Sequence, residues 1–472
     1  MLRKLRIALA AIFFIGITLL FVGIGHEWWG WMAKLQFLPS CFALNVGIIA
    51  AIVILTVLLG RIYCSVICPL GVFQDIVNWI SSRRKGKARR FKFKKERKWL
   101  RYGIFTVFVV LHFVGFQAVA ALIAPYSAYG RIVRSIVAPM QVGTIVIVVA
   151  AVTLVLVAVL AWIGGRSWCN NVCPVGTLLG LLSNVAFIRP RIDESKCVGC
   201  KGCEKKCKAS CIDSANHKID YSRCVDCFDC IEDCKVGAIK YHFELPWKNN
   251  GATFRSDEKK QEGADAGRRA FIAGTAIAVG SAATLKAQDI EGGLAAIEGK
   301  KAPQRTGRLV PFGAQSEKDF YSRCTACQLC VSACPNNVLR PSTDFEHMMQ
   351  PQMGYENGYC RPECTECSQV CPAGAILPLT PEEKTTVHIG RAVVDYDLCV
   401  VNRDGVSCGN CSRHCPVGAI IMVSKDPSDP GSPKIPTVLE EKCIGCGACE
   451  NLCPSRPYSA IHVNGLSVHI KD

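Results

Sequence analysis

Long uninterrupted apolar runs dominate the amino-terminal third of the chain. Four of them are long enough to cross a bilayer, which needs about 20 residues. Runs of this length and apolarity are rare in the cores of soluble proteins. The pattern therefore predicts a bundle of membrane helices. The four runs are Leu5–Ile24, Leu38–Leu59, Tyr102–Ile123 and Gly143–Ile163.

Basic residues are distributed unevenly between the loops. They crowd the amino terminus and segment 83–101, which has twelve Lys or Arg and a single acid, Glu96. The two opposite loops carry Lys34 in one and Arg131 and Arg134 in the other. Positively charged loops stay in the cytoplasm. We therefore expect the amino terminus, the basic segment and the residues just after the fourth run to lie on the cytoplasmic side. The net charge of +17 then reflects membrane orientation and not a nucleic-acid partner.

Thirty cysteines are far more than a chain of 472 residues ordinarily carries. A disulfide scaffold is one interpretation, but such scaffolds are typical of short secreted chains that lack a core. This chain is long and apolar, and it places its cysteines in tight triplets that converge better on a metal than on one another. We therefore expect metal ligation to be their main use.

The second and fourth apolar runs end in the same motif, G-R-x-aromatic-C-x3-C-P-x-G, at residues 60–71 and 165–176. The two copies lie 105 residues apart, which indicates a duplicated helical hairpin. Cysteines four apart on a helix share one face. Two such pairs at one membrane surface can present four thiols to a metal or cluster, or act as redox-active dithiols. Repetition argues against simple packing, which is the expectation for Cys41 alone. The four thiols belong to Cys64, Cys68, Cys169 and Cys173.

Two runs of C-x2-C-x2-C-x3-C follow the fourth apolar run. This spacing is typical of two-cluster ferredoxins, in which the fourth cysteine of each run ligates the other cluster. Zinc also takes four cysteines, but its sites use paired C-x2-C units, so [4Fe-4S] clusters are the expected cofactor. Lys208 and Lys235 replace the usual Pro, and Cys211 is an extra thiol that can replace Cys207. The expected sets are Cys197, Cys200 and Cys203 with Cys234, and Cys224, Cys227 and Cys230 with Cys207.

A polar linker over 249–267 leads to Arg268 and Arg269 and then to a Gly/Ala-rich apolar run that ends near Leu285. Two arginines before a short, weakly apolar segment are typical of twin-arginine export signals, with an ordinary core helix as the alternative. We expect a fifth, uncleaved membrane helix, because the cleavage site after Ala287 is weak. The rest of the chain is then expected outside the cytoplasmic membrane.

Four further cysteine quartets, each ending in Cys-Pro, fill the carboxyl-terminal part. Sixteen cysteines fit four [4Fe-4S] clusters, and the short apolar stretches 374–376 and 418–421 are expected as strands over them. Spacing leaves the partners open: fourth cysteines either exchange between neighbouring quartets, or the first quartet pairs with the fourth and the second with the third. The quartets are Cys324, Cys327, Cys330 and Cys334; Cys360, Cys364, Cys367 and Cys371; Cys399, Cys408, Cys411 and Cys415; and Cys443, Cys446, Cys449 and Cys453.

With four apolar runs, the twin motif and a two-cluster ferredoxin, the amino-terminal half resembles NapH, the quinol-dehydrogenase membrane subunit associated with periplasmic nitrate reductase. The carboxyl-terminal half resembles the MauM/NapG group of twin-arginine-exported ferredoxins, on Arg268-Arg269, the lead-in 308–314 and the four quartets. The chain looks like a NapH–NapG fusion that departs from the pattern in the missing prolines. The resemblance implies quinol oxidation at a bacterial inner membrane and electron delivery to a periplasmic cytochrome c or reductase.

The expected fold is therefore multi-domain: an α-helical membrane bundle of four to five helices plus α+β ferredoxin-like [4Fe-4S] domains. The expected domains are the membrane domain 1–190, a cytoplasmic ferredoxin 191–248, the linker and fifth helix 249–287, and a periplasmic ferredoxin 288–472. The expected function is electron transfer from the quinone pool through about six clusters. Quinol dehydrogenase activity follows from the resemblance alone, because no quinone motif is seen. The alternatives are metalloenzyme maturation or regulation, and relay from a cytoplasmic ferredoxin with the helices as an anchor.

Overall fold

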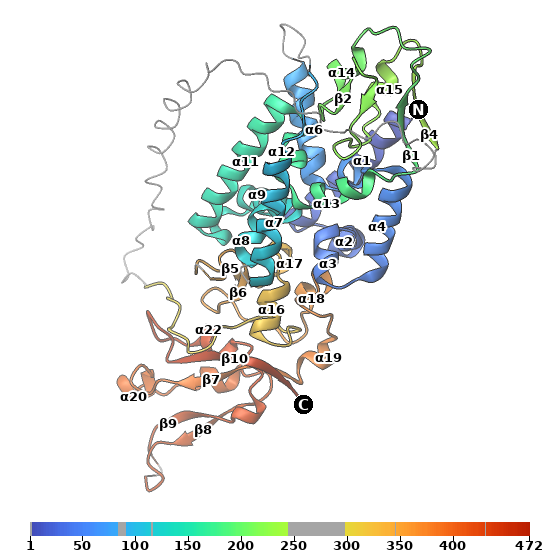
Figure 1. Ribbon diagram of the computed structural model, residues 1–472. Coiled ribbons are helices and arrows are strands. Elements are labelled where there is room, and N and C mark those ends of the chain that lie inside the picture. Colours follow the sequence, from blue (N-terminus) through green and yellow to red (C-terminus); the bar gives the residue numbers. More distant parts are fainter. Residues whose placement is uncertain (1, 84–90, 115–116, 244–297, 345, 430) are drawn as a thin grey trace. The chain divides into compact units, whose positions relative to one another are not determined.

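Helices make up nearly all of the amino-terminal part in the computed structural model, which describes residues 2–83, 91–114, 117–243, 298–344, 346–429 and 431–472 (Figure 1). The expected linker and twin-arginine segment, 249–287, lies outside these residues. In chain order the helices are α1 (Leu2–Val22), α2 (His26–Lys34), α3 (Phe37–Phe42), α4 (Val46–Leu59), α5 (Ile62–Val66), α6 (Pro69–Ser82), α7 (Lys98–Val114), α8 (Gln117–Ile123), α9 (Pro125–Val137), α10 (Pro139–Val142), α11 (Thr144–Gly164), α12 (Ser167–Asn171) and α13 (Pro174–Ser183).

Within the described ranges, two helices, α1 and α11, are long and apolar enough to cross a membrane. The expected run 38–59 is divided between α3 and α4. Leu44 adopts a left-handed conformation with φ 52°, and the Asn45 side chain accepts a hydrogen bond from the Ile48 N–H at 3.3 Å, which starts a new helix. The expected run 102–123 is shared by α7 and α8. Beyond α1 and α11, the bundle of four to five membrane helices therefore remains a prediction.

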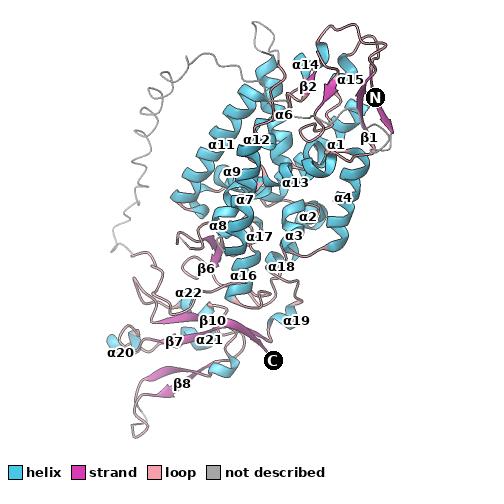
Figure 2. Cartoon of the chain, viewed as in Figure 1, coloured by secondary structure: helices cyan, strands magenta, loops and turns pink. Residues whose placement is uncertain are grey.

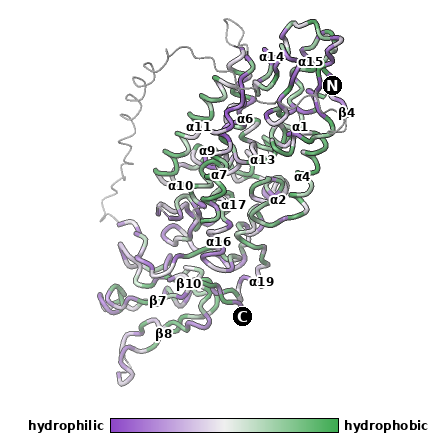
Figure 3. Tube along the Cα trace, in the orientation of Figure 1, coloured by the Kyte–Doolittle hydropathy of each residue, from purple (hydrophilic) through white to green (hydrophobic). Residues whose placement is uncertain are grey.

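The helices pack around a shared apolar core while large apolar side chains also face outward. Helix α11 contacts α6 and α9, α13 contacts α4 and α7, and α1 contacts α5 and α9. Figure 2 shows this predominantly helical part, and Figure 3 shows how hydrophobic α4 and α11 are along their length. Outward-facing apolar side chains occur on α1, α4, α7 and α11, including Ile12, Ile15, Ile54, Val107, Phe113, Val148, Val152 and Val155.

A small α+β unit, here called the first ferredoxin region (188–243), follows α13. Strand β1 (Ile188–Ile192) pairs antiparallel with β4 (Ile239–Phe243), and β2 (Ile212–Asp213) pairs with β3 (Lys218–Ile219). Between the strands lie the short helices α14 (Gly202–Lys206) and α15 (Asp229–Asp233). The expected α+β ferredoxin-like fold is thus present here.

The second ferredoxin region (298–472) contains three two-stranded antiparallel sheets, β5–β6, β7–β10 and β8–β9. The expected strand at 418–421 is confirmed in part, since β8 begins at Ile420. The expected strand at 374–376 is wrong: these residues form a bend, in which Gly374 has a φ of 64°. The elements are α16 (Glu317–Arg323), α17 (Leu329–Ala333), β5 (Leu339–Pro341), β6 (Pro351–Met353), α18 (Glu366–Val370), α19 (Pro381–Lys384), β7 (Val387–Val394), α20 (Val400–Arg403), α21 (Asn410–Arg413), β8 (Ile420–Ser424), β9 (Lys434–Val438), α22 (Ala448–Leu452) and β10 (Ile461–Lys471).

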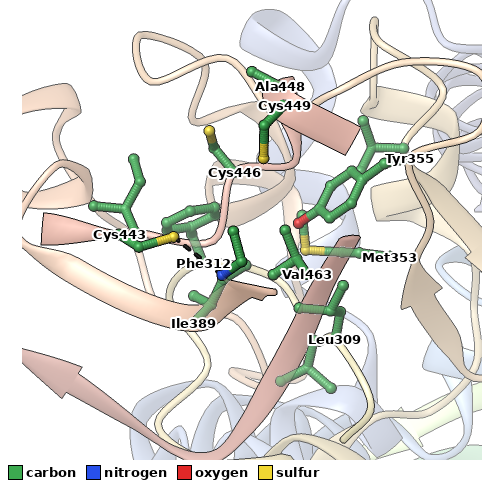
Figure 4. Close-up of a cluster of buried hydrophobic side chains, with 14 of the residues drawn as sticks. Leu309, Phe312, Met353, Tyr355, Ile389, Cys443, Cys446, Ala448, Cys449 and Val463 are labelled. Carbon is green, nitrogen blue, oxygen red and sulfur yellow. Dashed lines mark hydrogen bonds between the residues drawn. The ribbon is translucent and has the colours of Figure 1, made fainter. Parts of the chain in front are cut away.

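The core of the second ferredoxin region combines apolar side chains with thiols. Figure 4 shows Cys443, Cys446 and Cys449 beside Ile389, Val463 and other buried apolar residues. The Ala392 N–H donates to the Cys443 sulfur at 3.4 Å, which is the dashed line in Figure 4. The strands therefore hold these cysteines in place by packing and by a backbone hydrogen bond.

Candidate metal centres

Four hollows in the described part of the chain are each lined by at least four cysteines. In every case three of the cysteines come from one run and a fourth comes from the neighbouring run. The sets are Cys197, Cys200, Cys203 and Cys234; Cys224, Cys227, Cys230 and Cys207, with Cys211; Cys360, Cys364, Cys367 and Cys334; and Cys399, Cys408, Cys411 and Cys453.

Local backbone geometry explains how three thiols of one run come to face a single point. In four runs, the residues before and after the middle cysteine both have a positive φ, which curls the chain around that cysteine. A short helix (α14, α15, α17 or α22) then begins, and the fourth cysteine follows its last residue and reaches the neighbouring hollow. The pairs with positive φ are Gly199 and Lys201, Asp226 and Phe228, Ala326 and Gln328, and Gly445 and Gly447.

The thiols of the first and fourth quartets are grouped in the same way. Burial, together with the nearby Cys415 and Cys443 thiols, raises the pKa of Cys446 to about 12. Burial likewise raises the pKa of Cys327 to about 11, with Cys371 adding to the effect. Cys371 and Cys415, the fourth cysteines of the second and third quartets, therefore lie close to the first and fourth quartets. The structure therefore groups the fourth cysteine of each quartet with the neighbouring quartet, which is the first of the two arrangements that the spacing left open.

The arrangement of these thiols suits a bulky cluster better than a single ion. In residues 2–83, 91–114, 117–243 and the described part of 298–472, no three His, Cys, Asp or Glu side chains converge on a single-ion position. A tetrahedral zinc site would need four sulfurs about 2.3 Å from one point. The cysteines instead surround hollows, so the donor set fits an iron–sulfur cluster.

The extra thiol of the first ferredoxin region lies directly beside Cys207. The Cys207 and Cys211 sulfurs are 3.4 Å apart, and the Cys211 backbone N–H also donates to the Cys207 sulfur at 3.4 Å. The hydrogen bond from Cys211 lowers the pKa of Cys207. Both thiols line the same hollow, so either has access to it.

Lys208, flagged in the sequence only as a missing proline, is a buried ion-pairing residue. Its ammonium lies 3.2 Å from Asp75 on α6 and 3.0 Å from Asp229 on α15. Its backbone carbonyl accepts a hydrogen bond from the Arg166 N–H at 2.9 Å. Lys208 therefore joins the first ferredoxin region to the helices, a role that its place in the sequence gave no means of finding.

The four thiols of the twin motif are all buried. Cys64, Cys68 and Cys173 belong to one apolar core. Cys68 and Cys173 precede the first residues of α6 and α13, where Pro69 and Pro174 occupy the first helical position that proline favours. Cys169 accepts a hydrogen bond from the Gln74 amide at 3.1 Å, and Cys173 accepts one from the Gly176 N–H at 3.4 Å. Cys41 is half-buried at the edge of this core, as expected for a packing residue.

Comparison with known proteins adds a family to this geometry. Over 166 residues the chain is 36% identical to the methylamine utilization ferredoxin-type protein MauM of Methylobacillus flagellatus, a match that covers 34% of this chain and 70% of the relative. The chain belongs to the MauM/NapG family of ferredoxin-type proteins. It is also 32% identical to the ferredoxin-type protein NapG of Escherichia coli, over 31% of this chain and 66% of that protein.

Two family models match as well, and both describe iron–sulfur proteins. A 4Fe-4S binding domain matches residues 43–88 and 145–192, so each match contains one copy of the twin motif. A 4Fe-4S dicluster domain matches residues 323–375 and 381–456, which hold the first two and the last two quartets. This division agrees with the exchange of cysteines inside each pair of quartets. The protein is thus an iron–sulfur protein of the ferredoxin type, and its chemistry is electron transfer.

Proposed function

We propose that this protein is a membrane-bound electron carrier that takes electrons from quinol and passes them to a periplasmic acceptor, a cytochrome c or a reductase. The observation that carries the proposal is the set of hollows in which three cysteines of one run meet the fourth of its neighbour. Each set supplies the four thiolates of one [4Fe-4S] cluster. The six ligand sets are Cys197, Cys200, Cys203 and Cys234; Cys224, Cys227, Cys230 and Cys207; Cys324, Cys327, Cys330 and Cys371; Cys360, Cys364, Cys367 and Cys334; Cys399, Cys408, Cys411 and Cys453; and Cys443, Cys446, Cys449 and Cys415.

Outward-facing apolar side chains support the membrane location. Val148, Val152 and Val155 of α11 are 55–61% exposed, and Phe113 of α7 is 82% exposed. Contiguous apolar surface of this kind is rare on soluble proteins and is the natural surface of a helix in lipid. In this proposal α4 and α7, although shorter than α1 and α11, also face the hydrocarbon.

The two ends of α1 support the assignment of opposite sides to the two ferredoxin regions. Near its start, Arg3 forms an ion pair with Asp229 of the first ferredoxin region at 2.8 Å. Near its end, the Leu20 carbonyl accepts a hydrogen bond from Ser332 of the second region at 3.3 Å. Seventeen residues separate Arg3 from Leu20, which is about 26 Å at 1.5 Å per residue. This length is close to the hydrocarbon thickness of a bilayer, about 30 Å.

The basic and the less basic loops contact different ferredoxin regions. The basic segment binds the first region, where the Phe91 N–H donates to the Lys205 carbonyl at 3.1 Å and the Lys94 N–H to the Ser210 carbonyl at 3.3 Å. The segment with few basic residues, which contains α9, binds the second region through Ser127, whose hydroxyl donates to the Thr325 carbonyl at 2.6 Å. This division favours a cytoplasmic first region and a periplasmic second region.

The test uses the full-length protein, purified anaerobically in detergent and reconstituted in lipid vesicles. Six clusters predict about 24 iron and 24 sulfide per chain, four of each per cluster. Adding a quinol should bleach the visible cluster absorbance, and a carboxyl-terminal alkaline phosphatase fusion should be active in cells. A colourless, zinc-rich protein would refute the clusters, whereas full iron content with no bleaching by any quinol would refute only the donor.

A further inference from the structure

A buried lysine lies beside the hollow of the second quartet. Lys384 is 2% exposed, and its ammonium donates hydrogen bonds to the Arg361 carbonyl at 2.6 Å and to the Cys364 carbonyl. The ammonium nitrogen also lies 5.0 Å from the centre of the Phe312 ring. Cys364 and Phe312 both line the hollow. Lys384 therefore places a positive charge next to the cysteines of the second quartet.

The local sequence explains how this lysine is held in place. Thr380 caps the short helix α19: its hydroxyl accepts a hydrogen bond from the Glu383 N–H at 3.2 Å, and the Glu383 carboxylate accepts one from the Thr380 N–H at 3.1 Å. The Lys384 N–H donates to the Thr380 carbonyl at 3.0 Å. The Glu383 carboxylate is 44% exposed and pairs with Lys471 at 3.3 Å. The carboxylate next in sequence therefore binds other partners and leaves the charge of Lys384 unbalanced.

Lys384 differs in this respect from Lys208, the other buried lysine among the described residues. Lys208 lies between two carboxylates, 3.2 Å from Asp75 and 3.0 Å from Asp229. Lys384 binds carbonyl groups and makes no ion pair within the part of the chain that the structure describes. A buried charge without a partner is costly, so a negative group belongs near it. The cysteine sulfurs of the hollow are in position to provide that group.

Two other charged residues near the hollows of the second ferredoxin region are more exposed to water. Glu366 lines the same hollow as Phe312 but is exposed. Lys300 donates to the Glu450 and Asn451 carbonyls at 2.6 Å but is only half-buried. Water weakens the field of an exposed charge far more than protein weakens that of a buried one. The charge of Lys384 therefore acts more strongly on its hollow than either of these.

Two cysteines of the second quartet respond to this charge. Burial raises the pKa of Cys360 to about 11, and the Lys384 ammonium counteracts this rise. Burial also raises the pKa of Cys367, and Lys384 again acts in the opposite direction. A positive charge that favours thiolate over thiol also favours added negative charge on a cluster held by the same sulfurs.

The second quartet occupies an intermediate position in the second ferredoxin region. Cys334 of the first quartet lines its hollow. The Cys360 N–H donates to the Cys446 carbonyl of the fourth quartet at 3.0 Å. The fourth quartet in turn supplies Cys453 to the hollow of the third. The order of contact is thus first, second, fourth and third, so an electron that enters at the first quartet reaches the second before the other two.

We propose that Lys384 raises the reduction potential of the [4Fe-4S] cluster at Cys360, Cys364, Cys367 and Cys334 above those of the other three clusters of the second region, so that an electron is held there during transfer. This inference rests on the proposed function, which supplies the clusters and the quinol donor. A quinol loses two electrons and two protons; each electron adds one negative charge to one cluster, and the bonds to cysteine stay intact. Lys384 touches no reacting atom and is a positioning residue that acts through its charge.

The experiment is a redox titration of the full-length protein in detergent, with dithionite as reductant and redox dyes as mediators, followed by electron paramagnetic resonance. Cys364→Ser should change or remove one signal and thereby identify the cluster of the second quartet. Cys330→Ser, Cys411→Ser and Cys449→Ser identify the other three clusters of the second region in the same way. In the wild-type protein, the signal identified by Cys364→Ser should appear at the highest potential of the four.

Variants of Lys384 then test the cause. Lys384→Met keeps the length of the side chain without its charge and should make reduction of this cluster at least tenfold less favourable, which is about 59 mV for one electron. Lys384→Arg keeps the charge and should retain most of the wild-type potential. The matched control is Lys471→Met, which removes a lysine that is 58% exposed and should shift none of the four potentials.

Equal potentials in wild type and Lys384→Met would overturn the role of Lys384, and so would an equal shift in the arginine and methionine variants. If Lys384→Met fails to assemble this cluster, the wild-type order decides, because any other cluster of the second region at a higher potential would overturn the proposal. A protein without iron–sulfur signals would refute the proposed function itself. Clusters that dithionite reduces but quinol does not would refute only the donor and leave the measured effect of Lys384 valid.

Discussion

The two ferredoxin regions use the same cysteine spacing but bind the helices through different chemistry. The first region is attached by charges: Lys208 lies between Asp75 and Asp229. The second is attached by close packing and neutral hydrogen bonds: Leu329 and Val370 share an apolar core with the helices, and Thr325 accepts a hydrogen bond from Ser127. Cysteine spacing thus fixes the shape of the hollow, while the residues next to the cysteines decide what the region binds.

The position after the fourth cysteine shows this difference most clearly. In the second region it is proline in all four quartets, and proline can neither donate a backbone hydrogen bond nor form an ion pair. In the first region it is lysine twice, yet only Lys208 is buried, whereas Lys235 is exposed. The two lysines therefore provide an internal comparison.

Removing the buried charge should have the largest effect. Lys208→Met removes the cation that Asp75 and Asp229 share. Breaking a buried pair from one side costs about 3–5 kcal/mol, and we expect about 3 kcal/mol here because Arg166 still pairs with Asp75. We expect the first region to become sensitive to protease and to lose iron, as measured by limited proteolysis and iron analysis. Lys235→Met is the matched control and should behave like wild type. Equal effects of the two substitutions would contradict the charged attachment.

Crowding the packed attachment should have the next largest effect. A Cβ atom on Gly130 of α9 would lie 2.5 Å from the Cys327 carbonyl oxygen and 2.6 Å from the Phe21 ring. Gly130→Ala should therefore lower the stability of the second region's attachment by about 1–3 kcal/mol, seen as a lower thermal midpoint in detergent. Gly103→Ala on α7 is the control, because a Cβ atom there meets nothing within 4 Å. A Gly130→Ala midpoint at or above wild type would show that the contact is looser than the structure indicates.

Acid should weaken the second region through His469 of β10. Burial lowers the pKa of His469 to about 4, whereas an unfolded histidine titrates near about 6.5. The stabilisation by the neutral ring is present above pH about 6.5 and is lost as the pH falls toward about 4, a change of about 3 kcal/mol, of which about 2 kcal/mol falls between pH 7.5 and 5. The wild-type thermal midpoint should therefore fall more between pH 7.5 and 5 than that of His469→Gln. Parallel losses in the two proteins would exclude this histidine as the cause.

The smallest effect is expected from the spare thiol of the first region, which has no equivalent in the second. Cys211→Ala removes a hydrogen bond to Cys207 and should cost about 0.5–1.5 kcal/mol while iron content stays unchanged. Cys207→Ala should lose iron unless Cys211 takes its place. Iron analysis of the two variants together shows which thiol is the ligand; the reverse pattern would assign that role to Cys211.

Local rules account for the cysteine hollows, because the close cysteine spacing is accompanied by backbone turns around Cys200, Cys227 and Cys446 and by the short helices that follow. The pairing of the first region followed from the ferredoxin rule, and the structure groups its thiols in that way. The pairing among the last four quartets stayed open in the sequence, since it depends on which runs become neighbours in space. The bend at 374–376 was missed because three apolar residues alone do not distinguish a strand from a packed turn.

Contacts between residues far apart in the chain could not be predicted from the sequence for the same reason. The apolar runs 5–24 and 143–163 correspond closely to helices α1 and α11. The run 38–59 was expected as one helix, but it is divided at Leu44 and Asn45, where the Asn45 side chain caps a new helix. Nothing in the order of residues indicated that Lys208 would meet Asp75 on a helix more than a hundred positions away. The sequence shows the arginines of the twin motif, but only the fold shows which groups they bind.

The arginines of the twin motif cross between its two copies: Arg166 donates to the Cys64 carbonyl at 2.7 Å, and Arg61 donates to the Asn170 side chain at 2.9 Å. This crossing bears on how such a protein can arise. In a lone hairpin with one copy of the motif, Arg61 would still lie near the sulfur of its own Cys64, but it would lose the Asn170 acceptor that the other copy supplies. A single-copy ancestor would therefore have needed a second identical chain. In such a dimer, the arginine of each chain would have bound the acceptors of the other chain. Fusion of the two copies into one polypeptide makes the contact between them permanent. The sequence of each half can then diverge as long as the arginine contacts between the halves are kept.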